Sequence, residues 1–211
     1  MSTFNDIDIE CPQCGQEFRG TVWVAVHAGQ DPELKDLLLG GELNLVSCPE
    51  CSYVTYQDRF MIYQEPRAEL LAYIYPESQR DQQDELQKLM QAGFKEAQAV
   101  MPEKERIVYE PILLFGLEAL IELLREEAAL AEQSQIAQVL CEQNKVKTEL
   151  LRPAHARRLG TMRIIPRTGN GPIPTRTDVL AGIEKLLEID PVLDFYAKLQ
   201  TTIQANPGWT L

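Results

Sequence analysis

Four of the five cysteines in this 211-residue sequence fall in two matched pairs. Cys11-Pro-Gln-Cys14 and Cys48-Pro-Glu-Cys51 share the pattern Cys-Pro-x-Cys, and 33 residues separate the pairs. Two residues between cysteines let one tight turn direct both thiolates at a single ion, and proline presets the backbone φ angle of that turn. Two such turns facing each other form a tetrahedral four-sulfur site, the geometry of structural zinc. We therefore predict Cys11, Cys14, Cys48 and Cys51 as ligands of one Zn²⁺.

A site closed by four thiolates leaves no position for a substrate, so we expect a structural ion rather than a catalytic one. Iron is the alternative metal, because Cys-Pro-x-Cys turns around a tetrathiolate site are similar to those of rubredoxins, where the ion carries one electron. Gly15 permits the positive φ that such a turn often needs, but Ser52 replaces the corresponding glycine in the second turn. Unmetallated buried cysteines and redox-active dithiols are two further interpretations, which the matched spacing disfavours.

The other residues that could do chemistry form no recognisable catalytic set. The two histidines are His27, at the end of a predicted strand, and His155, in a basic segment. The sequence contains no HExxH, P-loop, dinucleotide or GxSxG motif. Cys141 stands beside apolar residues at helical spacing, which favours a packed and unreactive thiol. We therefore expect a protein that is not an enzyme.

The charge is unevenly distributed. The chain carries 20 Lys and Arg against 32 Asp and Glu, a net charge of −12, which argues against binding nucleic acid or an anionic membrane over the whole surface. Residues 145–176 are the exception, with eight basic residues against one acidic residue, a net charge of +7. If nucleic acid is a partner, we expect it to bind through this segment. The favoured interpretation is that the segment lies on acidic surface, within the chain or across a homodimer.

Targeting signals are not visible in the sequence. The N-terminal residues are acidic and lack a basic region followed by an apolar run, so we expect no signal peptide. The most apolar stretch, residues 112–124, is interrupted by Glu118 and Glu122 and is too short to cross a bilayer. We predict a cytoplasmic protein without membrane association, and in that compartment paired cysteines indicate metal rather than disulfides.

The elements that must position the cysteines follow from the hydrophobic pattern. Residues 21–27 and 43–46 read as strands, the second leading directly into Cys48, with a helix between them. That helix is predicted to begin with Asp31 as N-cap and Pro32 at its first position, and to end at Gly40-Gly41. Residues 60–63 and 70–75 read as two antiparallel strands joined by a short polar loop.

The rest of the chain is predicted to be mostly helical. Ser78 and Asp81 form a capping-box pattern ahead of apolar residues at helical spacing up to Met101. The segment 106–115 is ambiguous between a strand and the entry to a helix. Further expected elements are helices over 117–130 and 135–151, a basic Pro/Gly-rich loop over about 152–176, a helix starting at Thr177 or Asp178, and a helix with Asp190 as N-cap and Pro191 first.

The chain resembles the CpXC family, which is named for its two Cys-Pro-x-Cys motifs. The resemblance rests on both cysteine pairs, on the Asp31-Pro32-Glu33-Leu34-Lys35 turn into a helix, on Leu43-Asn44 and on the hydrophobic hairpin ending at Pro76, and it runs from about Asp8 to the helix over 117–130. It implies a metal-binding domain of bacteria and archaea with no characterised activity.

Together these features predict an α+β fold in two parts. Residues 1–130 form a zinc-ribbon-like antiparallel sheet with an inserted helix and flanking helices, and residues 131–211 form a mostly helical region. The expected function is a zinc-stabilised module that interacts with an unidentified protein partner. A nucleic-acid-associated or transcription-related factor and an iron electron carrier are the alternatives.

Overall fold

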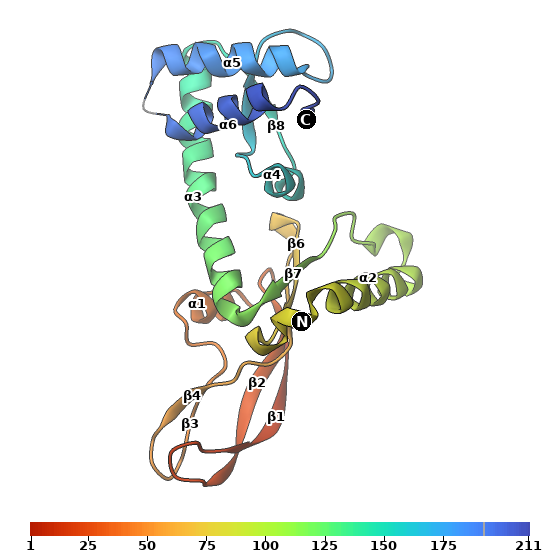
Figure 1. Cartoon of the computed structure of the whole chain (residues 1–211), viewed down its shortest axis with the longest axis vertical. Coiled ribbons are helices and arrows are strands. Elements are labelled where there is room, and N and C mark those ends of the chain that lie inside the picture. The colour runs from red at the N-terminus through yellow and green to blue at the C-terminus, as the bar shows by residue number, and fades with distance from the viewer. Residues whose placement is uncertain (192) are drawn as a thin grey trace. The chain divides into compact units, whose positions relative to one another are not determined.

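The computed structural model describes residues 1–191 and 193–211. Their contacts divide the chain into two compact units, Met1–Arg125 and Glu126–Leu211, and the division falls inside a helix. The chain has the predicted α+β class: the first unit is built on a five-stranded sheet and the second on helices with a small hairpin (Figure 1). Among the described residues, no helix is long and apolar enough to cross a membrane.

The large sheet of the first unit is mixed, not wholly antiparallel as predicted. Its strands lie in the order β1 (Thr3–Glu10), β2 (Glu17–His27), β5 (Met61–Glu65), β6 (Leu70–Tyr75), β7 (Ile112–Phe115). β1–β2 and β5–β6 are antiparallel pairs, whereas β2–β5 and β6–β7 are parallel. The long connections before β5 and before β7 allow the chain to return in the same direction, which a short hairpin loop does not.

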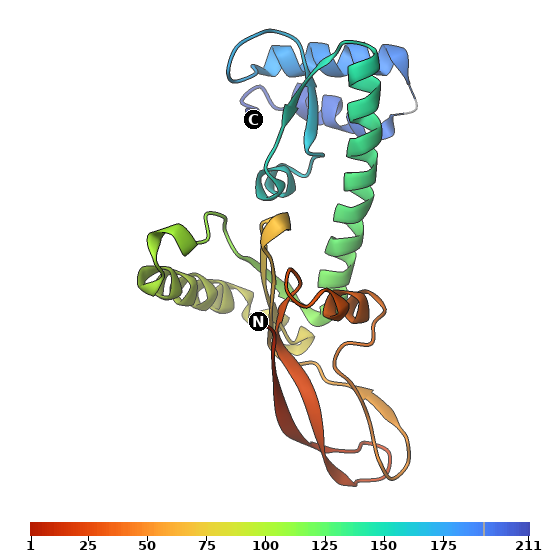
Figure 2. The ribbon, with the colours of Figure 1, turned by 180° about the vertical axis from the view of Figure 1, so that it is seen from behind.

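The connection between β2 and β5 carries the inserted helix and a second, small sheet. The helix α1 (Pro32–Leu39) begins and ends as predicted, although the Asp31 carboxylate accepts a hydrogen bond from the Ser2 backbone N–H at 3.0 Å and does not cap the helix. β3 (Leu45–Ser47) and β4 (Val54–Tyr56) form an antiparallel hairpin, which lies beside the β1–β2 hairpin in both ribbon views (Figures 1 and 2).

Both faces of the large sheet are packed. On one face Met61, Tyr63, Leu70, Ala72 and Ile74 are buried against the apolar residues of α1 and of the first turns of α3 (Gly116–Gln143). On the other face Tyr75 and Phe115 contact Leu86 of α2 (Gln83–Val100). The sheet is therefore a rigid base for the hairpins that extend from it.

Two helical predictions are wrong in detail. The capping box expected at Ser78 is replaced by a 3₁₀ turn, η2 (Glu77–Gln82), and α2 begins after it. The helices expected over 117–130 and 135–151 are one continuous helix, α3, because the intervening residues include no glycine or proline to interrupt it. The segment after α3 is a strand, β8 (Lys147–Leu150). The shorter 3₁₀ turns are η1 (Pro66–Ala68) and η3 (Glu103–Glu105).

The second unit has more regular structure than its composition suggests. β8 pairs antiparallel with β9 (Ile164–Arg167), and α4 (Pro153–Leu159) lies between them in sequence. The loop predicted over 152–176 is therefore reduced to the short segments 160–163 and 168–175. α5 (Arg176–Ile189) begins with a capping box of Thr175 and Asp178. Asp190 ends α5 and does not start the next helix, and α6 (Asp194–Ala205) starts after it. A separate apolar core joins α5, α6, β9 and the end of α3.

Candidate metal centre

Each cysteine pair lies in the turn of a hairpin. The first turn, residues 11–16, joins β1 to β2, and the second, residues 48–53, joins β3 to β4. We call these turns the two knuckles. Both span six residues between strands, and each places its first cysteine at the end of the incoming strand. The two hairpins therefore present the same structure from two separate parts of the chain.

The backbone hydrogen bonds of the two knuckles match. The N–H of Cys11 donates to the carbonyl of Gln16 at 2.9 Å, and the N–H of Cys48 donates to that of Tyr53 at 2.8 Å. Four residues after each first cysteine, an N–H donates back to that cysteine's carbonyl at 2.9 Å. The residues donating it, Gly15 and Ser52, have φ of +70° and +58°. The positive φ predicted for Gly15 is confirmed, and Ser52 adopts the same conformation although it carries a Cβ.

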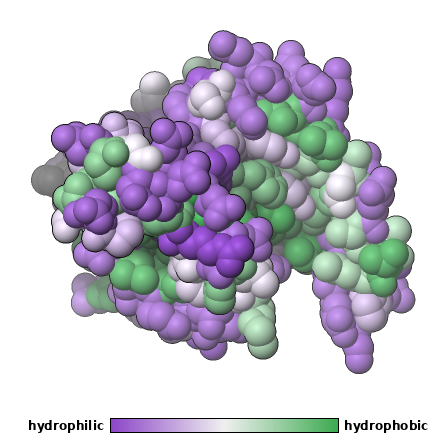
Figure 3. Space-filling view, turned by 90° about the horizontal axis from the view of Figure 1, so that it is seen from below, coloured by the Kyte–Doolittle hydropathy of each residue, from purple (hydrophilic) through white to green (hydrophobic). Residues whose placement is uncertain are grey.

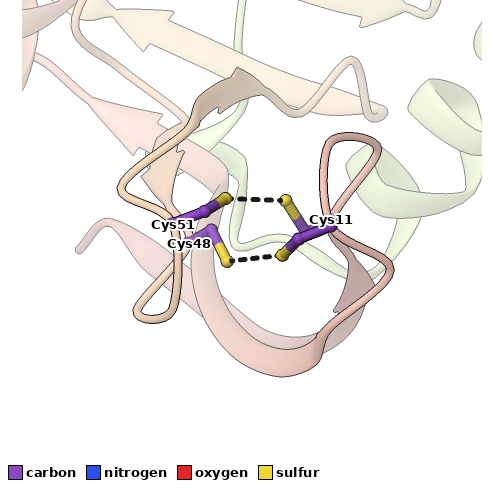
Figure 4. Close-up of side chains that lie close together, drawn as sticks. Cys11, Cys48 and Cys51 are labelled. Atoms are coloured by element: carbon purple, nitrogen blue, oxygen red, sulfur yellow. Dashed lines mark hydrogen bonds between the residues drawn. The ribbon is translucent and has the colours of Figure 1, made fainter.

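The four sulfurs form a compact cluster. The Sγ atoms of Cys11 and Cys51 are 3.6 Å apart, those of Cys14 and Cys48 are 3.7 Å apart (Figure 4), and all four lie within 4.8 Å of one another. Four sulfurs at about 2.3 Å from one ion in a tetrahedron are separated by about 3.8 Å. The cluster thus has the size of a tetrathiolate site, and these four cysteines can hold a metal ion.

The sulfurs differ in their access to solvent. Cys11 and Cys48 are buried, with 2% exposure each, whereas Cys14 and Cys51 are exposed. The first cysteine of each knuckle therefore lies on the protein side of the cluster and the second on the solvent side.

A glycine that the sequence reasoning did not select lets the two hairpins meet. A Cβ on Gly20 of β2 would lie 2.5 Å from Cδ1 of Ile9 and 3.1 Å from Cγ1 of Val46. Ile9 and Val46 are both buried, so this contact fills the space under the knuckles. A glycine inside a strand often marks a place where another part of the chain approaches closely. Gly20, which adjoins the strand predicted over residues 21–27, was therefore the sequence signal for this contact.

The thiols influence one another's ionisation. At Cys11, burial raises the pKa, but hydrogen bonds from the backbone and from the Cys51 and Cys14 thiols outweigh it and lower the pKa to about 7. At Cys14, the backbone of Gln16 lowers the pKa, but burial and the three neighbouring thiols together raise it to about 12. The cluster therefore resists full ionisation unless a cation compensates the charge.

The other candidate residues lie elsewhere. His27 ends β2, and His155 is in α4; neither belongs to the cysteine cluster, the one metal-capable group found among the described residues. Cys141 is fully buried, and burial followed by the nearby Glu142 carboxylate raises its pKa to about 11. It is packed, as predicted.

Several cations of the basic segment are engaged by other groups of the second unit, inside the segment or outside it. Arg157 forms an ion pair with Glu127 of α3, and Arg167 lies 3.6 Å from Glu149. The Arg176 guanidinium donates to the carbonyls of Ile203 and Gln204 at the end of α6, at 2.8 and 3.2 Å. These charges stabilise the unit internally.

The fold and the site define a ribbon-type α+β protein whose two cysteine knuckles, carried on separate hairpins, can hold one metal ion. A family model described as CpXC protein matches residues 9–137, which include both knuckles and most of α3. The chain belongs to the CpXC family. Comparisons with curated proteins and with solved structures found no match.

Proposed function

We propose that the four cysteines bind one Zn²⁺ as a structural ion. The observation that supports this most directly is the cluster itself, in which four sulfurs from two matched knuckles stand at tetrathiolate distances. All four tetrahedral positions are then protein ligands, so the ion stabilises the fold and has no position for a substrate. Binding would restrain two hairpins that have few other contacts in common, and its free energy would add to that of folding.

Metal analysis of the purified chain tests this proposal. We expect one equivalent of zinc in the wild-type protein and in the Cys141→Ser variant, which removes a thiol outside the cluster. Cys48→Ser, which removes a buried ligand, is expected to lose the metal and to unfold the ribbon, because three sulfurs remain and the second knuckle then holds the ion only through the exposed Cys51. Unchanged metal content and thermal stability in Cys48→Ser would contradict the proposal.

Iron is the second candidate, because the same four sulfurs would suit tetrahedral Fe²⁺ or Fe³⁺. The two ions are distinguished by colour: a ferric tetrathiolate absorbs strongly in the visible, whereas a zinc site is colourless. A red protein containing one iron after purification from its own cells would identify an electron carrier and exclude the zinc assignment.

We further propose that the zinc-stabilised ribbon serves interaction or assembly with a protein and is not an enzyme. Its support is the closed cysteine site, in which four protein sulfurs would fill the tetrahedral positions and leave none for a substrate. The nucleic-acid alternative would have to use cations such as Arg158, which is exposed and forms no ion pair with the described residues. Salt-dependent binding of DNA or RNA, lost in Arg158→Glu, would favour that alternative.

A further inference from the structure

The β3–β4 hairpin is apolar on both faces. Val46, on the inner face, is buried against the β1–β2 hairpin, near Gly20. On the outer face, Leu45 pairs directly with Tyr56, and Val54 follows on the same side of β4. These three side chains are 42%, 40% and 53% exposed, and they are not part of any core cluster of the described residues. Tyr56 also interacts with the backbone of Leu117, but no core contact in the described part of the chain accounts for the apolar character of Leu45 and Val54.

The outer face continues into a groove of about 410 Å³, because Tyr56 also lines the groove. Leu38, Leu43 and Ile121 contribute apolar walls, from α1, the segment before β3, and α3 respectively. We refer to the outer face and this groove together as the ribbon surface. Both lie within the first unit. The space-filling view shows hydrophobic residues interspersed among hydrophilic ones on the surface seen from below (Figure 3).

The charged groups of the groove are carboxylates. Asp58, Glu77 and Glu118 line it, and no lysine or arginine does so among the described residues. Arg80 compensates Glu77 through two hydrogen bonds, and Glu118 stands in the first turn of α3, where the helix dipole stabilises it. Asp58 is different: its Oδ2 accepts from the Glu77 backbone N–H at 2.9 Å, but its Oδ1 is buried without a donor among the described residues.

A buried carboxylate oxygen that lacks a donor leaves its negative charge uncompensated, and a cation placed in the groove beside Asp58 would reduce that electrostatic cost. Among the neighbouring residues, Glu42 precedes β3 and Glu50 lies in the second knuckle, whereas Arg59 follows Asp58 and Arg125 is engaged with the Leu39 carbonyl at 2.9 Å. A zinc ion with four thiolates would carry a further net charge of −2. Apolar contact area beside unpaired negative charge is complementary to an apolar segment that carries lysine or arginine.

We propose that the ribbon surface binds a segment of a partner protein in which apolar residues alternate with lysine or arginine. The apolar side chains pack on Leu45, Val54 and Tyr56, and one basic side chain enters the groove and is attracted by the negative charge of Asp58. This inference rests on the proposed interaction function and specifies the chemistry of its partner.

The test uses the full zinc-loaded chain, labelled with ¹⁵N, and three short synthetic peptides that alternate Val with Lys, Val with Glu, and Ser with Lys. We expect the Val–Lys peptide to bind and to shift amide resonances over residues 41–58 and 115–121. Val54→Ser and Asp58→Asn are expected to weaken binding about tenfold each. Leu89→Ser and Asp84→Asn, which make the same changes at exposed positions of α2, serve as matched controls and should leave binding unchanged.

Several outcomes would overturn the proposal. They are undetectable binding of the Val–Lys peptide, equal binding of the Val–Glu or Ser–Lys peptide, resonance shifts elsewhere, or equal weakening by the control variants. Self-association of the free chain that Val54→Ser abolishes would assign the surface to a homodimer instead. Zinc is assayed in the same samples, so one equivalent of zinc without peptide binding would reject the ribbon surface and leave the metal site standing. A folded chain without any bound metal would reject the metal site.

Discussion

At the scale of single residues, the knuckles show how a short motif determines a local structure. The ligand positions and the positive φ at Gly15 follow from Cys-Pro-x-Cys-Gly. Proline fixes φ at a negative value early in the turn, whereas glycine allows the positive φ that ends it. Gly20 was not selected from the sequence, because its importance depends on Val46, which is distant in the chain. Local chemistry could therefore be predicted, but the contact between two hairpins could not.

Substituting Gly15 isolates the conformational requirement of the first knuckle. A Cβ at Gly15 would have no atom within 4 Å, so the expected cost of Gly15→Ala, about 1 kcal/mol, comes from its φ of +70° alone. Gly93→Ala is the matched control, because this site is equally open but lies inside α2, where alanine should stabilise by about 0.5–1 kcal/mol. Chemical unfolding of the metal-loaded proteins measures both. A neutral Gly15→Ala would contradict the argument.

Metal binding should depend steeply on pH. The pKa of Cys14 is raised to about 12 and that of Cys51 is also raised, so near pH 8 the metal-free protein holds both as thiols, and binding must release their protons. The release of these two protons alone makes the affinity fall at least a hundredfold for each pH unit lowered. Below the pKa of Cys11, about 7, the proton of that thiol adds to the competition and the fall becomes steeper. Competition with a zinc-chelating dye at several pH values measures this, and a pH-independent affinity would be the contrary result.

At the scale of elements, helices and strands were predicted correctly where the hydrophobic periodicity is strong and were missed or misassigned where it is weak. The apolar runs at residues 60–63 and 70–75 and the Pro32 helix start correspond to β5, β6 and α1. The exposed edge strand β1 was missed. Only Ile9 is buried in it, and most of its other residues are polar, so it has few of the apolar residues by which a half-buried strand is recognised. The strand β8 was read as helix, because Val146 and Leu150 fit a helical spacing as well as a strand. Parallel pairings depend on long connections, which local patterns do not reveal.

The packing of the two hairpins predicts that Gly20 supports the metal site from beneath. Gly20→Val places branched carbons where Ile9 and Val46 already lie, and such overpacking is expected to cost about 1–3 kcal/mol. It should also weaken zinc binding, because it moves the second knuckle away from the first. Thr21→Val, at the exposed neighbouring position of β2, is the control. Unfolding and zinc titration of both variants provide the measurement; equal behaviour of the two would show that Gly20 has no such role.

At the scale of the whole molecule, the net charge of −12 averages over regions with different roles. The positive charge of residues 145–176 is visible in the sequence, but its use is not, because Glu127 and the carbonyls at the end of α6 come from distant segments. Arg157 and Arg176 use their charge within the second unit. Residues 1–60, which carry both knuckles, have three basic and ten acidic residues, a net charge of −7, and this part of the chain is electrostatically unfavourable for nucleic acid.

The division into two units predicts that removing the metal has a local effect. The first unit and the second have separate apolar cores, and the cysteine cluster lies in the first. Chelation should therefore expose the amides of β1–β4 to hydrogen exchange, because their hairpins lose the ion that joins them, while amides of α5 and α6 stay protected. Hydrogen exchange followed by mass spectrometry, with and without EDTA, distinguishes the regions. Re-adding zinc should restore protection, which separates metal loss from irreversible unfolding. If α5 and α6 lost protection together with the ribbon, the chain would behave as one cooperative body, and the ion would stabilise the whole of it.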